Sequence, residues 1–483
     1  MIRNTYLSFA GCKVNGLLVL ILLICGGYSA AAETDTTGSE YVYIDSIVLE
    51  GNRKTRNSLI LRELEFSPGD SIRLDALEQS LERNCQRILN LKLFTVVTAE
   101  VGEWRPNKHV TLVFHITETW YILPVPVFFL ADRNFNVWWK EYKGSLKRVN
   151  YGIDLSHNNL SGAADVLKVK MEFGYNNYYG VSYRFPPLNR SQTLGLETGV
   201  AFSRQHEVAL TTRQNKLVFR KNPEEWQITQ FIAFSNLSWR PGLRTSHSFT
   251  AEYRHSRAAD SIALILNPDY FGNGQTRQRH LSLVYNLRMD YRDIQPYPLH
   301  GWLGVLEIRY NGILPSDNLR LFRAYAEYGY YTPLVKRLYL DATIKGRTSI
   351  PRSKPPYFNN QALGYSGNFV RGYEYYVADG LDFGVIKTAL HYEFFNRSIN
   401  LGKFMPFHAF KVMPLKLYLS LNNDLGYAND PYYGAGNPVS NRSLYGYGLG
   451  LDIVAWYNKT ARFEYSWNDM GEGGLYIRID SGF

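Results

Sequence analysis

The chain has 483 residues, 45% of them hydrophobic, and a formal net charge of +10 at pH 7. This length leaves room for a large core or for more than one domain. A mean hydropathy of −0.27 excludes a bundle of membrane helices, although 37 tyrosines and 26 phenylalanines make the chain unusually aromatic. We expect the basic surplus to meet anionic lipid headgroups rather than a specific anionic substrate, and nothing indicates a nucleic-acid partner.

Residues 1–32 have the pattern of an export signal that is removed. Arg3 and Lys13 precede a short apolar run from Leu17 to Ile24, and Ala30-Ala31-Ala32 supplies small residues for cleavage. The apolar run is too short to span a bilayer, so we expect removal rather than anchoring. Cleavage would leave one cysteine, which excludes an internal disulfide in the mature chain.

Residues 41–120 mix strand and helix patterns and predict a small α+β domain of order β-α-α-β-β. A turn is expected at Gly51-Asn52, after the first strand. Cys85 lies on an apolar stripe at helical spacing, and we interpret it as core filling because an isolated thiol there has no partner for chemistry. Residues 121–148 are expected to form a linker.

Residues 149–483 follow a period of two. On one segment Leu417 and Leu419 alternate with Tyr418 and Ser420, and such segments run to about 10 to 15 residues with aromatics near their ends. A soluble all-β assembly also alternates, but its polar faces look outward and its strands are usually shorter. The pattern therefore predicts an all-β, antiparallel transmembrane barrel of about 16 strands.

The connections between the expected strands differ in length. Bacterial barrels place short turns in the periplasm and long loops outside, so we expect tight connections near 174–177, 203–206 and 240–243 on the periplasmic side, with the N-terminal domain. The long connections, expected together on the other side, are near 257–277, 348–382 and 424–443.

Several short motifs occur in order along the chain. They are Ile47-x-x-x-Gly51-Asn52, Pro68-Gly69-Asp70, Asp290-Tyr291-Arg292-Asp293 with Pro298 and Gly301, Val370-Arg371-Gly372-Tyr373, Asp424-x-Gly426 and Gly448-x-Gly450. With them the chain resembles the BamA/TamA superfamily of outer-membrane assembly and translocation proteins, over nearly its whole mature length. The N-terminal domain resembles one POTRA domain, whereas the principal assembly factors of that family resemble a string of several.

The resemblance implies that the loop carrying Val370-Arg371-Gly372-Tyr373 folds back into the barrel lumen as a plug. Gly372 would let its backbone approach the wall, and Tyr373 would pack there. Alternation along the strands directs four carboxylates into the lumen as partners for Arg371. These are Asp424, Glu464, Asp452 and Glu393.

We expect Arg371 to pair with Asp424 first and Glu464 second, because a planar guanidinium binds carboxylates bidentately. Alternatively, the carboxylates solvate the lumen or pair with Lys387 and Arg462. The turn motif, Asp290, Arg292, Asp293, Pro298 and Gly301, is expected to be structural and periplasmic. The chain ends on Phe483, an aromatic terminal barrel signal, although Ser481 stands where the family often has an apolar residue.

The resemblance implies an insertase or translocase in the outer membrane of a Gram-negative bacterium, with the POTRA domain in the periplasm. Its expected partners are outer-membrane lipid, unfolded exported or outer-membrane clients, and periplasmic accessory proteins. A dedicated secretion pore for one partner protein is the alternative, and a passive diffusion channel is a further one. We expect no enzyme activity, cofactor or metal, because the histidines lack metal spacing and no activated nucleophile is evident.

Overall fold

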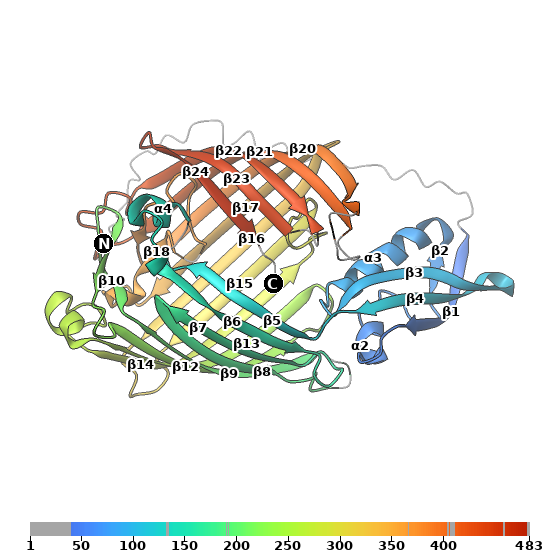
Figure 1. Ribbon diagram of the computed structural model, residues 1–483, viewed down its shortest axis with the longest axis horizontal. Coiled ribbons are helices and arrows are strands. Elements are labelled where there is room, and N and C mark those ends of the chain that lie inside the picture. The colour runs from blue at the N-terminus through green and yellow to red at the C-terminus, as the bar shows by residue number, and fades with distance from the viewer. Residues whose placement is uncertain are drawn as a thin grey trace, which may run out of the picture.

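The computed structural model describes residues 40–131, 135–189, 191, 193–365, 367–402, 405, 411–456 and 459–480. The expected export signal over 1–32 and the terminal Phe483 lie outside these ranges. Figure 1 shows a small α+β domain followed by a large antiparallel sheet that curves into a barrel. Within the described ranges, no helix is both long and apolar enough to cross a membrane.

The N-terminal domain is a four-stranded sheet of order β2-β1-β4-β3 with helices against one face. Strand β1 pairs in parallel with β4, and the other pairs are antiparallel. Cys85 is buried in the core between helix and sheet, as its helical spacing predicted. The elements are β1 Tyr41–Glu50, α2 Asn57–Leu61, β2 Ser71–Arg73, η1 Leu74–Ala76, α3 Leu77–Leu89, β3 Phe94–Arg105, η2 Pro106–Lys108 and β4 His109–Glu118.

The predicted order β-α-α-β-β is confirmed with one addition, the three-residue strand β2, which is too short to show a period in the sequence. The predicted turn is present at Gly51 and Asn52. Gly51 has φ +94°, and a Cβ there would lie 2.0 Å from the backbone oxygen of Ile116, so only glycine fits. The Asn52 side chain donates to the backbone oxygen of Thr55 over 2.9 Å and so shapes the following loop.

The barrel is a sixteen-stranded sheet in which each strand pairs antiparallel with the next wall strand along the chain. The predicted count and pairing are therefore confirmed. The wall strands are β5 Ile122–Leu130, β6 Val149–Asn158, β7 Val166–Gly174, β8 Asn176–Arg184, β9 Leu194–Gln205, β12 Ile228–Trp239, β13 Thr245–Ala258, β14 Arg277–Asp290, β15 Gly301–Asn311, β16 Leu321–Val335, β17 Leu338–Ile350, β20 Asp382–Asn400, β21 Val412–Asn429, β22 Ser443–Ala455, β23 Lys459–Asn468 and β24 Gly473–Asp480.

The linker predicted over 121–148 is corrected by the structure. It contains the first wall strand, β5, followed by α4 (Phe135–Tyr142) and η3 (Leu146–Arg148). Pro124 and Pro126 hid this strand, because proline cannot donate to a sheet ladder and argues against a strand in a sequence pattern. The hairpin of β10 (Glu207–Arg213) and β11 (Lys216–Lys221) is a separate two-stranded sheet outside the wall.

Because consecutive wall strands are antiparallel, their connections alternate between the two ends of the barrel. The three long connections share one end, here called the loop end, as predicted. The tight connection near 240–243 lies at the opposite end, as expected, but the tight connection near 174–177 lies at the loop end, which corrects its expected place. The connection that begins near 203–206 is also at the loop end and is not tight, because it runs from β9 to β12 and carries the β10–β11 hairpin. The missed first strand, β5, is the reason for the wrong end, since one uncounted strand shifts these two connections to the other side. The loop end also carries η4 Ser261–Leu266, η5 Tyr357–Asn359, β18 Gln361–Leu363 and β19 Ala378–Asp379.

The opposite end, here called the domain end, adjoins the N-terminal domain (Figure 1). The side chain of Glu63 pairs with Arg240 in the connection after β12, with Oε1 and Nη1 3.1 Å apart. Asn159, in the connection after β6, donates from Nδ2 to Thr55 Oγ1 over 2.9 Å. The domain is therefore fixed against two barrel turns.

Glu118, at the end of β4, organises the domain side of this junction. Its Oε1 accepts the backbone N–H of Thr55 over 2.7 Å and that of Lys54 over 3.1 Å. Burial opposes the charge, but the hydrogen bonds from Thr55 and Lys54 outweigh burial and hold the pKa of Glu118 below its ordinary value. The carboxylate stays ionised and keeps the loop that contacts the barrel in place.

Side-chain exposure on the wall is inverted relative to a soluble protein. On β21, Leu419 is 53% exposed and Leu421 45% exposed, whereas Ser420 is 4% and Asn422 2% exposed. Polar side chains fill the interior and apolar ones cover the outside. This is the arrangement of a membrane-spanning barrel, and a soluble all-β assembly would show the reverse.

Candidate functional site

The long loop of residues 351–381, which joins β17 to β20, enters the barrel and packs on its inner wall. Val370 and Tyr373 are buried with Leu363 of the same loop. They contact side chains such as Phe383 of β20 and Leu444 of β22. The loop is therefore part of the interior of the barrel, as the resemblance implied.

Glycines on the wall make this close approach possible. A Cβ at Gly446 of β22 would lie 1.8 Å from the backbone oxygen of Arg371, and a Cβ at Gly426 would lie 2.3 Å from Val370 Cγ2. On the loop, Gly372 has φ +78° and its Cβ would lie 2.5 Å from the oxygen of Trp467. Backbone of the loop thus lies directly on backbone of the wall.

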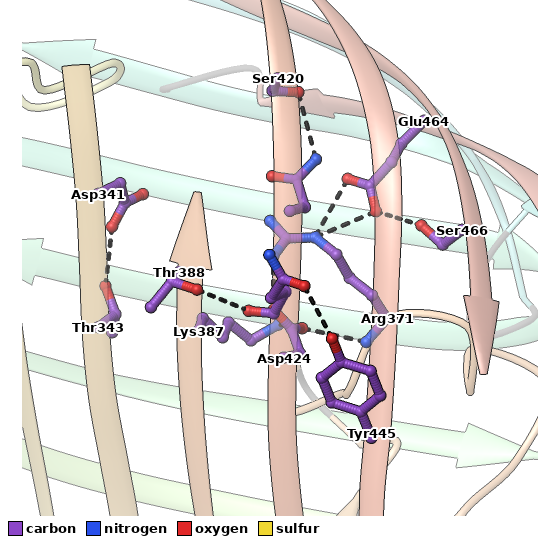
Figure 2. A network of polar contacts seen from close by, with 12 residues as sticks. Asp341, Thr343, Arg371, Lys387, Thr388, Ser420, Asp424, Tyr445, Glu464 and Ser466 are labelled. Atoms are coloured by element: carbon purple, nitrogen blue, oxygen red, sulfur yellow. Dashed lines mark hydrogen bonds and ion pairs between the residues drawn. The ribbon is translucent and has the colours of Figure 1, made fainter. Parts of the chain in front are cut away.

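Arg371 crosses β22 at Gly446, where no side chain projects from the wall, and contacts the strands on either side of β22. Figure 2 shows its guanidinium between the carboxylates of Asp424 on β21 and Glu464 on β23. Its backbone N–H donates to Asp424 Oδ2 over 3.0 Å, Nη1 donates to Oδ1 over 2.5 Å, and Nε donates to Glu464 Oε2 over 3.2 Å. All three residues are buried. The structure thus brings together the two pairs expected first and second.

Two further cations complete this network. Lys387 Nζ lies 3.0 Å from Asp424 Oδ2, so the alternative pairing with Lys387 is present beside the pairing with the loop. Arg478 of β24 places Nη1 3.2 Å from Glu464 Oε2 and Nη2 2.6 Å from Glu374 Oε1 of the loop. With the loop arginine, three cations face three carboxylates, so the buried charges balance. Such a network holds a segment in one position.

The rest of the loop motif reinforces the same position. Asn468 Nδ2, at the end of β23, donates to the backbone oxygen of Gly372 over 2.9 Å. The hydroxyl of Tyr373 donates to Asp469, and its ring is buried against the wall. Val370, Arg371, Gly372 and Tyr373 therefore each contact the wall by a different means.

Asp452 and Glu393 do not reach Arg371, which corrects the expectation that four carboxylates converge on it. Arg371 lies at the level of Gly446 on β22, and Asp452 is six residues further along that strand toward the domain end. At about 3.3 Å per residue, the separation along the strand is roughly 20 Å. Alternation correctly placed these carboxylates on the inner face of the wall, but it gives no information on how far along the barrel axis each one lies.

These two carboxylates belong to a second polar cluster near the domain end, around Tyr297. The hydroxyl of Tyr297 donates to Asp452 Oδ2 over 2.8 Å and lies 3.0 Å from His391 Nδ1. Glu393 accepts from the hydroxyl of Tyr418 over 3.0 Å, and the rings of Tyr297 and Tyr418 are 4.8 Å apart. Sequence reasoning missed Tyr297 because no spacing separates a tyrosine that enters a lumen from one at a membrane interface.

The predicted turn motif holds Tyr297 there. It lies in the connection between β14 and β15, at the domain end as expected. Asp290 Oδ2 pairs with Arg292 Nη2 at 2.7 Å, and Asp293 Oδ1 accepts two backbone N–H groups of the same turn, at 2.8 and 3.1 Å. Gly301 has φ +100° and no room for a Cβ, and Pro298 lies within the turn. The motif is structural in this sense: it shapes a turn that enters the barrel.

The fold and the site together define a class: a membrane-spanning β-barrel with an N-terminal α+β domain and a loop anchored in its lumen. Family models match two parts of the chain. The POTRA model, described as surface antigen variable number repeat, matches residues 42–119, and the Omp85 superfamily domain matches residues 159–382. The chain belongs to the Omp85 superfamily and carries a single POTRA domain in its described part.

Solved structures share the fold. The chain is similar to BamA from Haemophilus ducreyi lacking POTRA domains 1–3, with 12% identity and a TM-score of 0.53 over 91% of this chain and 83% of that one. It is also similar to CdiB from Escherichia coli, with 14% identity and a TM-score of 0.54 over 91% of this chain and 76% of that one. A search of curated proteins found no match.

Proposed function

We propose that this protein inserts or translocates polypeptides at the outer membrane. Its POTRA domain lies in the periplasm and captures unfolded exported polypeptides, and its barrel inserts them into the membrane or passes them across it. Membership of the Omp85 superfamily supports an outer-membrane protein of this kind. The proposal assigns the protein no catalytic step, cofactor or metal.

The observation that carries the proposal is the seam between the first and last wall strands. The order of the sheet begins at β5 and ends at β24, and within the described ranges no ladder joins these two strands. Both lie on the near side of the barrel in Figure 1. An unpaired strand edge is a template for another extended chain, so the seam is suited to receive a client strand.

The sequence of β5 keeps this edge weak. Pro124 and Pro126 lie opposite Leu155 and Ile153 of β6. Since a proline nitrogen carries no hydrogen, the ladder to β6 does not use it, and the two nitrogens face the seam instead. The seam edge of β5 therefore lacks two of its hydrogen-bond donors, which disfavours stable pairing with β24.

The closed interior favours insertion at the seam over simple diffusion. The anchored loop occupies the lumen, and the loop end is covered by a buried cluster that includes Tyr270, Phe271 and Tyr357. The β10–β11 hairpin is tied to this cover, because the hydroxyl oxygens of Thr212 on β10 and Tyr357 lie 3.0 Å apart. A passive channel or a dedicated secretion pore would first have to displace these segments.

The POTRA domain offers a second open edge for capture. Within the described residues, strand β3 pairs only with β4 and forms one edge of its sheet over 12 residues. Unpaired backbone groups along such an edge bind extended chains with little dependence on sequence, because the hydrogen bonds involve main-chain atoms. This supports a broad set of unfolded clients.

The double substitution Pro124→Val and Pro126→Val is expected to strengthen the seam and slow insertion. Two restored backbone donors can add roughly 2 kcal/mol of stability in total, at about 1 kcal/mol for each hydrogen bond. The measurements are the thermal unfolding temperature of the barrel and its rate of inserting an unfolded barrel protein into liposomes. Pro333→Val, on β16 and away from the seam, is the matched control. A variant that is more stable yet inserts clients at the original rate would show that the seam is not the route.

Depletion of the protein, followed by quantification of the outer-membrane and secreted proteomes, tests the function itself. We expect a broad loss of barrel proteins from the outer membrane, because many clients would share one insertion site. Loss of a single secreted protein would instead support the dedicated pore. Unchanged proteomes together with reduced uptake of small solutes would contradict both and leave the diffusion channel.

A further inference from the structure

Three arginines face the outside of the barrel at the loop end of β13 and β14. They are Arg257, Arg277 and Arg279, and all three are exposed. Gln278, between two of them, is fully buried and donates to Asn359 of the anchored loop, so its neighbours along the strand point outward.

The strand register brings these three charges close together. Arg257 lies directly opposite Arg277, and Arg279 follows two residues later on the same face. Like charges directly opposite each other destabilise a sheet, so an anion between them would relieve a real repulsion. Within the described residues, none of the three forms an ion pair with a carboxylate of the chain.

The two nearby carboxylates, Asp317 and Asp260, do not pair with these arginines. Asp317 Oδ2 accepts the backbone N–H groups of Leu281 and Leu314, at 3.1 and 2.8 Å, and so stabilises the neighbouring loop. Asp260 lines an open hollow of ≈ 530 Å³ together with Arg277 and Asn318. Among the described residues of this region, three arginines face the carboxylates of Asp260 and Asp317, which leaves a surplus of one positive charge.

Apolar side chains surround the arginines on both sides. Beyond the strand ends, in η4, Leu264, Ile265 and Leu266 are 56%, 76% and 45% exposed. On the wall, toward the domain end, Leu283 and Phe249 are exposed on the outer face. A site for a soluble anion needs no such surface, whereas a lipid offers a charged headgroup and apolar chains together.

The arginines lie at the level of the wall where lipid headgroups are expected. They occupy the last residues of the outer face at the loop end, where the apolar band that meets lipid tails finishes, and charged side chains cost least at this level. Guanidinium groups bind phosphate bidentately and remain charged at any physiological pH.

We propose that Arg257, Arg277 and Arg279 form a binding site for the phosphate-bearing headgroup of a membrane lipid in the leaflet at the loop end. The acyl chains of that lipid lie along the outer face near Leu283 and Phe249. The site faces away from the seam: β14 and β15 are the middle of the sheet order, with eight wall strands in each half. A lipid bound there holds the wall opposite the seam and leaves the seam free.

The experiment compares the full chain with the triple variant Arg257→Gln, Arg277→Gln, Arg279→Gln in nanodiscs. The probe is lipid A, a phosphorylated glycolipid, in phosphatidylcholine, and lipid retained by the protein is measured by native mass spectrometry. The wild type is expected to retain lipid A in preference to phosphatidylcholine. Because each basic residue near an anionic surface contributes about five-fold, the triple variant should bind on the order of a hundred-fold more weakly.

The control is the double variant Arg213→Gln, Arg220→Gln, which removes two exposed arginines of the β10–β11 hairpin. This hairpin lies at the loop end but is not part of the barrel wall, so the variant should retain lipid A as the wild type does. Should the triple variant not fold, as judged by heat-modifiable migration, Arg277→Gln alone is expected to weaken binding about five-fold. Equal retention by the wild type and the arginine variants would overturn the proposal. Complete displacement of lipid A by inorganic phosphate would also overturn it, because the site would then be one for a soluble anion.

Discussion

Replacing Arg371 with alanine is expected to release the long loop from the lumen and to destabilise the barrel strongly. The change leaves Asp424 and Glu464 buried without their central partner, and removing one member of a buried ion pair typically costs about 3–5 kcal/mol. Lys387 and Arg478 remain in contact with those carboxylates and offset part of the loss. The measurements are the unfolding temperature by heat-modifiable migration and the rate of proteolysis within residues 351–381.

A matched control comes from the same loop. Arg352 pairs with Asp382 over 2.6 Å, but its side chain is 51% exposed, so Arg352→Gln should change stability by less than about 1 kcal/mol. Arg371→Lys keeps the positive charge but cannot contact Asp424 and Glu464 at once with a planar group. Its unfolding temperature and its rate of loop proteolysis should therefore lie between those of the alanine variant and the wild type. Similar effects of Arg371→Ala and Arg352→Gln would show that the buried network does not hold the loop.

The substitution Gly446→Val is expected to expel the loop while every charge of the network remains. Its Cβ would lie 1.8 Å from the backbone oxygen of Arg371 and 2.7 Å from the backbone carbon, and a backbone contact cannot be relieved by a change of rotamer. Overpacking usually lowers the free energy of unfolding by about 1–3 kcal/mol, and we expect the backbone clash in Gly446→Val to cost at least the upper value of that range. Protease sensitivity of residues 351–381 and insertion activity in liposomes are the two measurements.

Gly384→Val is the control, because Gly384 lies on β20, two strands from β22 in the same wall, and a Cβ there has nothing within 4 Å. It should leave the loop protected. The pair of glycine variants separates two roles of the loop. If Gly446→Val frees the loop and insertion continues at the original rate, the loop is a structural plug; if insertion stops while the barrel stays folded, the seated loop is needed for activity. A loop that stays protected in Gly446→Val would contradict the close approach seen here.

Alternation along single strands was enough to predict the wall of this protein. It identified the antiparallel barrel, and it placed Asp424 and Glu464 on the inner face and Leu419 on the outer face. The motif around Arg371 then indicated which loop enters the lumen. Each of these inferences depends on a period of two or on a short motif, and both are local properties of the chain.

Local patterns failed where position along the barrel mattered. Asp452 and Glu393 share the inner face with Asp424, yet they lie near the domain end with Tyr297. Their height depends on the stagger between neighbouring strands, which the whole closed sheet determines. In the same way, the local pattern of residues 121–148 indicates a linker and not the strand β5, because the two prolines of β5 fit a strand only at the edge that faces the seam.

The sequence by itself thus determined which side chains face lipid and which face the lumen, because the side-chain period of a strand is a property of each segment alone. Only the tertiary structure decided which inward residues meet. It placed Arg371 across the bare glycines of β22, between two strands that are distant in sequence, and it left the seam between β5 and β24 unpaired within the described residues. Those features arise from register, curvature and the meeting of the two ends of the sheet, and no segment of the chain encodes them separately.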